Sequence, residues 1–184
     1  MRRMLSVILA LSLMLCLSAC GGSEPESGAA SAVPQEAEPL DPKEAAASSF
    51  RMISTSVEFA EDRMNDFVEH IAGLGTEYTA QDLHDFCETG IKNCMTYRDH
   101  LEDAPDQTNS EEYRDAAYSY IINVEAALIK MRDYLEDQNK EDLDYVSGCI
   151  ELQNTYAITF AAAQQQYLMD AGFTSDEIAD LLDG

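Results

Sequence analysis

Apolar residues recur at alternating intervals of three and four along the stretch from Phe50 to Leu74. The positions with this spacing are Phe50, Ile53, Val57, Ala60, Met64, Phe67, Ile71 and Leu74. Residues three and four apart lie on the same face of an α-helix, whereas a half-buried strand alternates with a period of two. The stretch therefore predicts a long amphipathic helix whose apolar face is buried against other helices.

The same spacing returns three more times. The second stretch contains Leu83, Cys87, Gly90, Cys94, Tyr97 and Leu101, the third contains Ala117, Ile121, Val124, Leu128, Met131 and Leu135, and the fourth contains Val146, Cys149, Gln153, Tyr156, Phe160, Ala163 and Tyr167. Segments with Gly73, Pro105 and Asn139 separate the four stretches. Thr174 followed by Glu177 has the pattern of a capping box and predicts a last short helix over residues 175–182. We predict an all-α protein, an up-down four-helix bundle with a short C-terminal fifth helix.

The three cysteines in these stretches are predicted to be free thiols. Cys87 and Cys94 are seven residues apart, which is about 10 Å along a helix. A disulfide needs Cα atoms within about 7 Å of each other. In an up-down bundle the second and fourth helices are diagonal, which also keeps Cys149 out of reach. We expect all three cysteines to be buried and to pack as small apolar side chains.

The beginning of the chain has a different composition. Arg2 and Arg3 precede an uncharged run from residue 4 to residue 17, shorter than the about 20 apolar residues of a membrane-spanning helix. A basic start, a short apolar run and small residues at its end are typical of a secretory signal. The tetrapeptide Leu17-Ser18-Ala19-Cys20 resembles the lipobox of bacterial lipoproteins. The resemblance implies cleavage before Cys20 and attachment of lipid to its thiol.

This resemblance divides the chain into three parts: a lipoprotein signal peptide (1–19), the lipidated cysteine with a linker (20–42) and the helical bundle (43–184). Residues 21–42 are mostly Gly, Ser, Ala, Pro and Glu, with no aromatic residue. Such a composition buries too little apolar surface to fold, so we expect a disordered tether. The resemblance implies a location on the extracytoplasmic face of a bacterial cell membrane, with the lipid on Cys20 as the anchor.

The charge of the chain narrows the choice of partners. There are 35 acidic and 11 basic residues, which gives a formal net charge of −24. Nucleic acids and anionic lipid surfaces carry the same sign, so we predict no nucleic-acid partner. The sequence also lacks the Glu-x-x-His pairs of di-iron bundles, paired Cys-x-x-Cys motifs and a Gly-rich phosphate loop. We therefore expect no cofactor, no resident metal and no enzyme activity.

One group of acidic residues is regularly spaced. Glu58, Asp62, Asp66 and Glu69 follow one another at intervals of four, four and three along one face of the first predicted helix. Carboxylates at this spacing repel one another, and a divalent cation that favours oxygen ligands relieves such repulsion. The sequence leaves open whether this acidic stripe binds cations or is simply a solvated helix face.

Two long segments contain almost no charge. Glu151 is the only charged residue from Tyr145 to Met169, and Glu125 is the only one from residue 116 to residue 129. An exposed helix face normally carries charged side chains. We therefore predict a second apolar face, formed by Tyr118, Ile122, Ile129, Thr155, Thr159 and Ala162. It is interpreted as a homodimer contact, a groove for a protein partner, or the docking place of the short C-terminal helix.

Two functions are consistent with these observations. The first is a membrane-anchored binding or scaffold module, in which the uncharged face contacts another protein or a second copy. The alternative is a surface module that binds a cation or a small ligand, either at the acidic stripe or elsewhere in the bundle.

Overall fold

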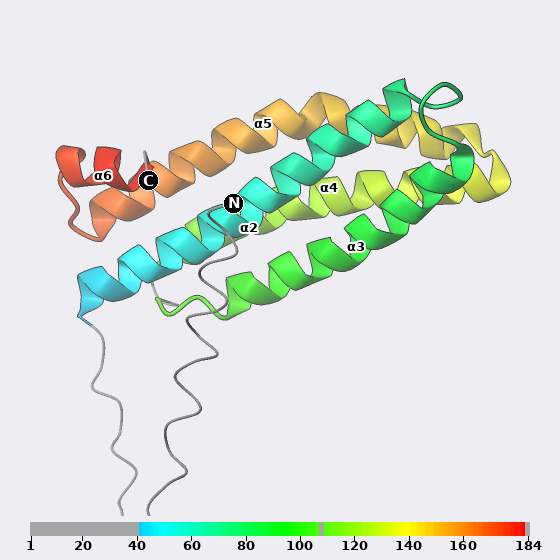
Figure 1. Ribbon diagram of the computed structural model, residues 1–184. Coiled ribbons are helices and arrows are strands. Elements are labelled where there is room, and N and C mark those ends of the chain that lie inside the picture. The colour runs from blue at the N-terminus through cyan, green and yellow to red at the C-terminus, as the bar shows by residue number, and fades with distance from the viewer. Residues whose placement is uncertain (1–40, 107–108, 183–184) are drawn as a thin grey trace, which may run out of the picture. The chain divides into compact units, whose positions relative to one another are not determined.

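The computed structural model describes residues 41–106 and 109–182. Four long helices follow one another, α2 (Pro42–Ala72), α3 (Ala80–Glu102), α4 (Glu111–Asp137) and α5 (Lys140–Asp170), and the short helix α6 (Ser175–Leu182) comes last (Figure 1). No sheet forms within these described residues, where the one β-bridge is isolated. The predicted all-α bundle with a short C-terminal helix is confirmed. The signal peptide, Cys20 and nearly all of the predicted linker lie outside the described residues.

The helix boundaries follow the capping residues of the sequence. Asp41 precedes α2, and its side chain accepts a hydrogen bond from the amide of Lys43 at 2.9 Å. Thr79 and Asp82 form a reciprocal capping box at the start of α3. The side chain of Asn139 accepts from the amide nitrogen of Glu141 at the start of α5. Each contact satisfies a backbone N–H that has no partner within its helix, and so fixes where the helix begins.

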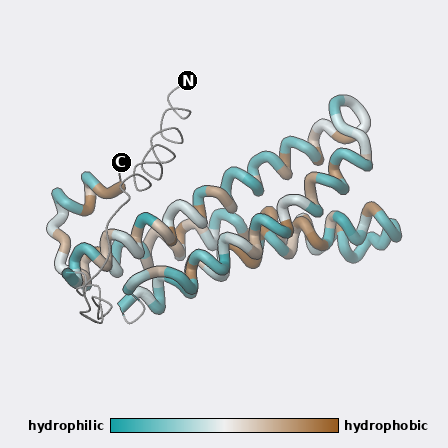
Figure 2. Tube along the Cα trace, turned by 60° about the horizontal axis from the view of Figure 1, so that its bottom comes forward, coloured by the Kyte–Doolittle hydropathy of each residue, from teal (hydrophilic) through white to brown (hydrophobic). Residues whose placement is uncertain are grey.

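Helix α4 is the centre of the bundle. It packs against α2, α3 and α5, whereas α3 and α5 lie on opposite sides of it and do not meet within the described residues. Its side chains Tyr113, Ile121 and Leu128 are almost completely buried. Hydropathy along the chain follows this packing, with apolar positions recurring along the long helices between hydrophilic ones (Figure 2). The residues from Pro39 onward form one compact unit with its own core, so we expect this part to fold by itself.

Gly90 on α3 faces side chains of both α4 and α2. A Cβ atom at this position would lie 2.7 Å from Cδ1 of Leu128 on α4 and 3.2 Å from Cδ of Arg63 on α2. Ordinary contacts between carbon atoms are 3.5–4.0 Å. The absence of a side chain at Gly90 therefore lets α3 approach both neighbours closely.

The three cysteines of the bundle are free and buried, as predicted. Burial raises the pKa of Cys87 and of Cys94 to about 12, and it also raises the pKa of Cys149. The thiolate is the reactive form of cysteine, so these shifts leave all three side chains as inert packing groups near neutral pH.

The contact between α2 and α5 is the weakest among neighbouring long helices. It is made by the first half of α2 and the last third of α5. The side-chain amide of Gln164 donates to Oγ of Ser54 at 2.9 Å, and the Tyr167 hydroxyl lies 3.4 Å from the carbonyl oxygen of Ala46. Helix α5 is therefore held mainly by α4, and its opposite side is left uncovered.

Candidate functional site

The outer side of the α4–α5 hairpin carries the residues that the sequence marks as a possible interaction face. Tyr118 on α4 is 46% exposed, and Ile122 and Ile129 are half-buried. On α5, Thr155, Thr159 and Ala162 are exposed. None of these six side chains is in the interior of the monomer.

Larger apolar side chains lie on the same helix and were not part of the predicted face. Ile158 is 64% exposed and Leu152 is 48% exposed. Ile158 lies three residues after Thr155 and four before Ala162, which places all three on one side of α5. Its position in the sequence indicates this placement, because Ile158 is two residues from the buried Phe160 and therefore lies on almost the opposite side of the helix. The uncharged face is defined here as Tyr118, Ile122, Ile129, Leu152, Thr155, Ile158, Thr159 and Ala162.

Side-chain contacts set the register of the hairpin. Asn123 on α4 donates its Nδ2 hydrogens to the carbonyl oxygen of Cys149 and to Oε1 of Gln153, each at 3.0 Å. Nearer the turn, Lys130 contacts Asp142 at 2.7 Å. This register places Ile122 at the level of Glu151 and Leu152 on α5.

The one charge within the middle of α4 does not disturb this face. Glu125 is 7% exposed, and its carboxylate accepts from Arg98 of α3 at 3.4 Å. The same arginine lies over the ring of Tyr118, 5.9 Å from its centroid. Glu125 therefore turns toward α3. Glu151 is the one exposed charge between Tyr145 and Met169, and it lies on the same side of α5 as Thr155 and Ile158, four and seven residues further on.

Helix α6 does not cover the uncharged face. Its Glu177 forms a salt bridge of 2.7 Å with Lys43 at the start of α2, and the Lys43 ammonium lies 4.8 Å from the ring centroid of Phe173. Ile178 is the buried residue of α6. The interpretation of the face as the docking place of this helix is therefore wrong. The helix turns toward α2 because Gly172, at φ +82°, ends α5 in a Schellman motif.

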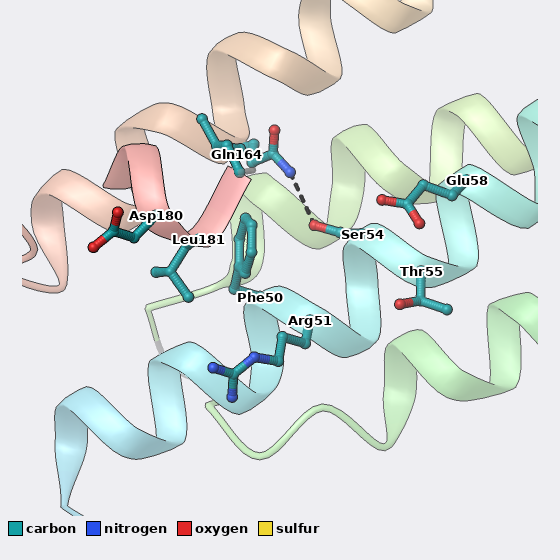
Figure 3. A pocket seen from close by; sticks show the side chains of 9 residues that line it. Phe50, Arg51, Ser54, Thr55, Glu58, Gln164, Asp180 and Leu181 are labelled. Atoms are coloured by element: carbon teal, nitrogen blue, oxygen red, sulfur yellow. Dashed lines mark hydrogen bonds between the residues drawn. The ribbon is translucent and has the colours of Figure 1, made fainter. Parts of the chain in front are cut away.

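A pocket of about 470 Å³ lies where α2, α5 and α6 meet (Figure 3). It is lined by Phe50, Arg51, Ser54, Thr55, Glu58, Gln164, Asp180, Leu181 and Leu182. It exists because α5 touches α2 so sparsely, which leaves a gap that α6 only partly closes. Helical spacing in the sequence does not predict this pocket, because it does not report where two helices separate.

The floor of this pocket is a chain of hydrogen bonds between three helices. Gln164 donates to Ser54 Oγ, and Ser54 Oγ lies 2.7 Å from the hydroxyl oxygen of Tyr113, itself 3.4 Å from the Phe50 carbonyl oxygen. Burial raises the pKa of Tyr113 well above its usual range, so the phenol stays protonated. The network therefore offers neutral hydrogen-bonding groups beside the apolar side chains of Phe50 and Leu181.

The acidic stripe remains on the surface of α2. Glu58, Asp62, Asp66 and Glu69 are all exposed. Within the described residues, no three His, Cys, Asp or Glu side chains come together in a way that would hold a metal ion. In the part of the chain that the structure describes, the stripe is thus a row of carboxylates along one helix and does not gather into a coordination shell.

Comparisons with known proteins give no family for this chain. No protein-family model, curated protein or solved structure matches it. Among the described residues, every helix is too short or too polar to cross a bilayer.

Proposed function

We propose that this protein is a binding module tethered to the extracytoplasmic face of a bacterial membrane by lipid on Cys20. The uncharged face of the α4–α5 hairpin is its protein-binding surface. The observation that carries the proposal is the exposure of uncharged and apolar side chains, above all Ile158 and Leu152, on a chain with a net charge of −24.

Solvent exposure of apolar side chains costs free energy. Apolar surface gains about 25 cal/mol for each Å² removed from water, so an exposed isoleucine favours a partner that covers it. Contiguous apolar patches on monomeric proteins often mark interaction sites. On the uncharged face, such residues stand beside threonine and alanine, and neither α6 nor another helix of the described bundle covers them.

Photo-crosslinking in cells tests this binding surface. A photoreactive phenylalanine analogue replaces Ile158 in one variant and Met95 in another, because Met95 on α3 is also exposed, at 50%. We expect discrete crosslinked protein products from position 158 and none from position 95. Equal products from both positions, or none from position 158, would contradict the proposal.

The anchor is tested separately. Cys20→Ala removes the thiol that would accept the lipid, so we expect the protein to leave the membrane fraction and to lose incorporation of labelled palmitate. The variants Cys87→Ala and Cys94→Ala should keep both, because these thiols are buried in the bundle. Membrane retention of the Cys20→Ala variant would contradict the proposed anchor.

The pocket between α2, α5 and α6 favours a second candidate function, binding of a small ligand. Native mass spectrometry of residues 39–184, purified from the natural host without chelators, would show a retained molecule as extra mass. Leu181→Trp fills the pocket and should abolish the extra mass. Leu74→Trp, on an exposed residue away from the pocket, should leave it unchanged. A parent protein without added mass would contradict this second function.

A further inference from the structure

We infer that the pocket between α2, α5 and α6 binds a small organic amine, a primary ammonium group carried on an apolar body. This inference rests on the second candidate function, binding of a small ligand, and names the chemical class of that ligand. It does not depend on the uncharged face. The pocket volume of about 470 Å³ lies in the range of about 300–1,000 Å³ that is usual for small-ligand sites.

The polar part of the pocket presents more hydrogen-bond acceptors than donors. Gln164 uses its Nε2 group on Ser54 Oγ at 2.9 Å, and its amide oxygen has no partner among the described residues. The carboxylate of Glu58, one helical turn after Ser54 on the same side of α2, can only accept. A ligand group with several donors is therefore matched to this part of the pocket. A primary ammonium has three donors and no acceptor.

The charges around the pocket also favour a cation. Two carboxylates line it, those of Glu58 and Asp180, against one basic side chain, Arg51. Among the described residues neither carboxylate forms a salt bridge, so both are available to a ligand. Burial is the main cause of the raised pKa of Tyr113, and the negative charge of Glu58 is a further one, which indicates that this carboxylate lies near the hydrogen-bonded floor. The net charge of −24 attracts cations to the whole bundle.

The remaining walls of the pocket are apolar. Phe50 of α2 and Leu181 of α6 line one part of it, whereas Ser54 and Gln164 line another (Figure 3). Leu182, at the end of α6, is 52% exposed. An apolar body on the ligand would cover these side chains and gain about 25 cal/mol for each Å² removed from water. An inorganic cation gains nothing from this part of the pocket.

The position of Arg51 favours a simple amine over an amino acid. Arg51 lies seven residues before Glu58, which is about 10 Å along α2. The ammonium and carboxylate of an amino acid are attached to the same carbon atom by bonds of about 1.5 Å, so they are too close together to reach both side chains. An amino acid held at Glu58 would thus bring its own carboxylate next to another one. We therefore expect Arg51 to oppose the binding of a cation and not to hold a carboxylate.

An NMR titration of residues 39–184 with phenethylamine tests the inference at pH 7 and about 150 mM NaCl. The ammonium of this probe is protonated at that pH, as the ammonium of lysine is. We expect saturable shifts of the Gln164 side-chain amide and of the Leu181 methyl groups, with a Kd of about 1 mM or below. Three compounds with the same ring vary the charge: phenethyl alcohol is neutral, hydrocinnamate is an anion and phenylalanine is a zwitterion. Each should bind at least about tenfold more weakly than phenethylamine.

Two matched variants locate the cation site. Glu58→Gln removes a carboxylate that lines the pocket and should raise the Kd of phenethylamine by about tenfold. Glu69→Gln makes the same change further along α2, away from the pocket, and should leave the Kd unchanged. Arg51→Gln should lower the Kd by up to about fivefold, because it removes a charge of the same sign as the ligand. Circular dichroism checks that the three variants keep the helical fold.

Three results would overturn the inference. The first is the absence of saturable phenethylamine binding up to about 20 mM. The second is equal or tighter binding of hydrocinnamate or phenylalanine. The third is an affinity that Glu58→Gln changes no more than Glu69→Gln does, because the amine is then attracted to the acidic surface in general.

Native mass spectrometry of the protein from its host separates this inference from the second candidate function. A retained amine supports both. A retained acid or zwitterion overturns the amine as ligand and leaves the pocket as a small-ligand site. A protein without added mass that also binds none of the four compounds contradicts both.

Discussion

Helices α2 and α5 have the same length of 31 residues and opposite surface character. The exposed side of α2 carries Glu58, Asp62, Asp66 and Glu69, whereas α5 has one charge, Glu151, from Tyr145 to Met169. Both helices bury apolar residues in the same core. Burial of one helix face is thus compatible with very different outer faces.

The two helices also differ in how deeply they are held. On α2 a continuous row from Phe50 to Phe67 is buried, whereas on α5 burial is confined to Asp142, Val146 and Cys149 near its beginning and to Phe160, Tyr167 and Leu168 near its end. Between Cys149 and Phe160, α5 contributes only half-buried and exposed residues. The middle of α5 therefore packs less deeply in the bundle than either end of the helix does, and the α5 residues of the uncharged face lie there.

The largest expected effect distinguishes the core of α2 from the exterior of α5. Ile53→Ala should lower the free energy of unfolding by about 2–5 kcal/mol, because Ile53 is fully buried and its truncation leaves a cavity. Ile158→Ala should change it by less than about 0.5 kcal/mol, because that side chain is mostly exposed. Urea unfolding of residues 39–184 at a concentration that keeps the protein monomeric measures both. Similar losses for the two isoleucines would remove the distinction.

A second prediction concerns the polar contact that holds α5 to α4. Asn123→Ala should cost about 1–3 kcal/mol, because it leaves the half-buried side chain of Gln153 without its donor. The double variant Asn123→Leu with Gln153→Leu should recover most of that loss, since both polar groups are then replaced by apolar ones. Urea unfolding of the three proteins gives the comparison. A double variant less stable than Asn123→Ala would show that the contact does more than satisfy its two amides.

A smaller effect is expected on the acidic side of the comparison. Asp62→Asn removes repulsion with Glu58 and Asp66, each four residues away, and should stabilise the bundle by about 0.2–0.5 kcal/mol for each pair at low salt. The gain should fade as salt screens the charges. Thermal unfolding with and without Ca²⁺ also tests the acidic stripe for cation binding. A calcium effect on the melting temperature larger than that of ionic strength, lost in Asp62→Asn, would show a site there.

The smallest effect is local and involves α6. The salt bridge with Lys43 and the cap of Thr174 lower the pKa of Glu177 to about 2. A carboxyl whose pKa is lowered in the folded state stabilises the docked helix at pH values above its ordinary pKa of 4.5. This stabilisation is lost as the pH falls toward 2. Amide NMR signals of α6 should therefore shift between about pH 5 and about pH 2 while those of α4 stay in place. In Glu177→Gln the shifted signals should already be present at neutral pH, whereas Asp176→Asn should behave like the parent.

Much of the bundle was predictable because helix formation depends on local spacing. The apolar residues at intervals of three and four predicted the four long helices and most of their core positions. The capping residues Thr79, Asn139 and Thr174 marked three of the helix starts. The prediction that the three cysteines stay unpaired followed from the rise between Cys87 and Cys94 along one helix and from the diagonal placement of the helix that carries Cys149. The lipid anchor at Cys20 remains a prediction from the leader, because it lies outside the described residues.

The candidate site was only partly predictable. The scarcity of charge on α4 and α5 is a property of the sequence, and it identified Thr155, Thr159 and Ala162 before any packing was known. The predicted face did not include the exposed Ile158, because an apolar residue on the side of α5 opposite the core positions can equally belong to a second buried face. Whether it is buried depends on which elements pack against α5.

The amino-acid sequence by itself determined the helices, their ends and the segments without charge, because each depends on residues within a few turns of one another. Only the tertiary structure decided that α4 is central, that α5 is separated from α2 along much of its length, and that α6 binds at Lys43 rather than over the uncharged face. These outcomes depend on side chains distant in sequence, such as Gly90 against Leu128 and Ser54 against Gln164. Close packing between helices selects one arrangement among several that the same local patterns allow.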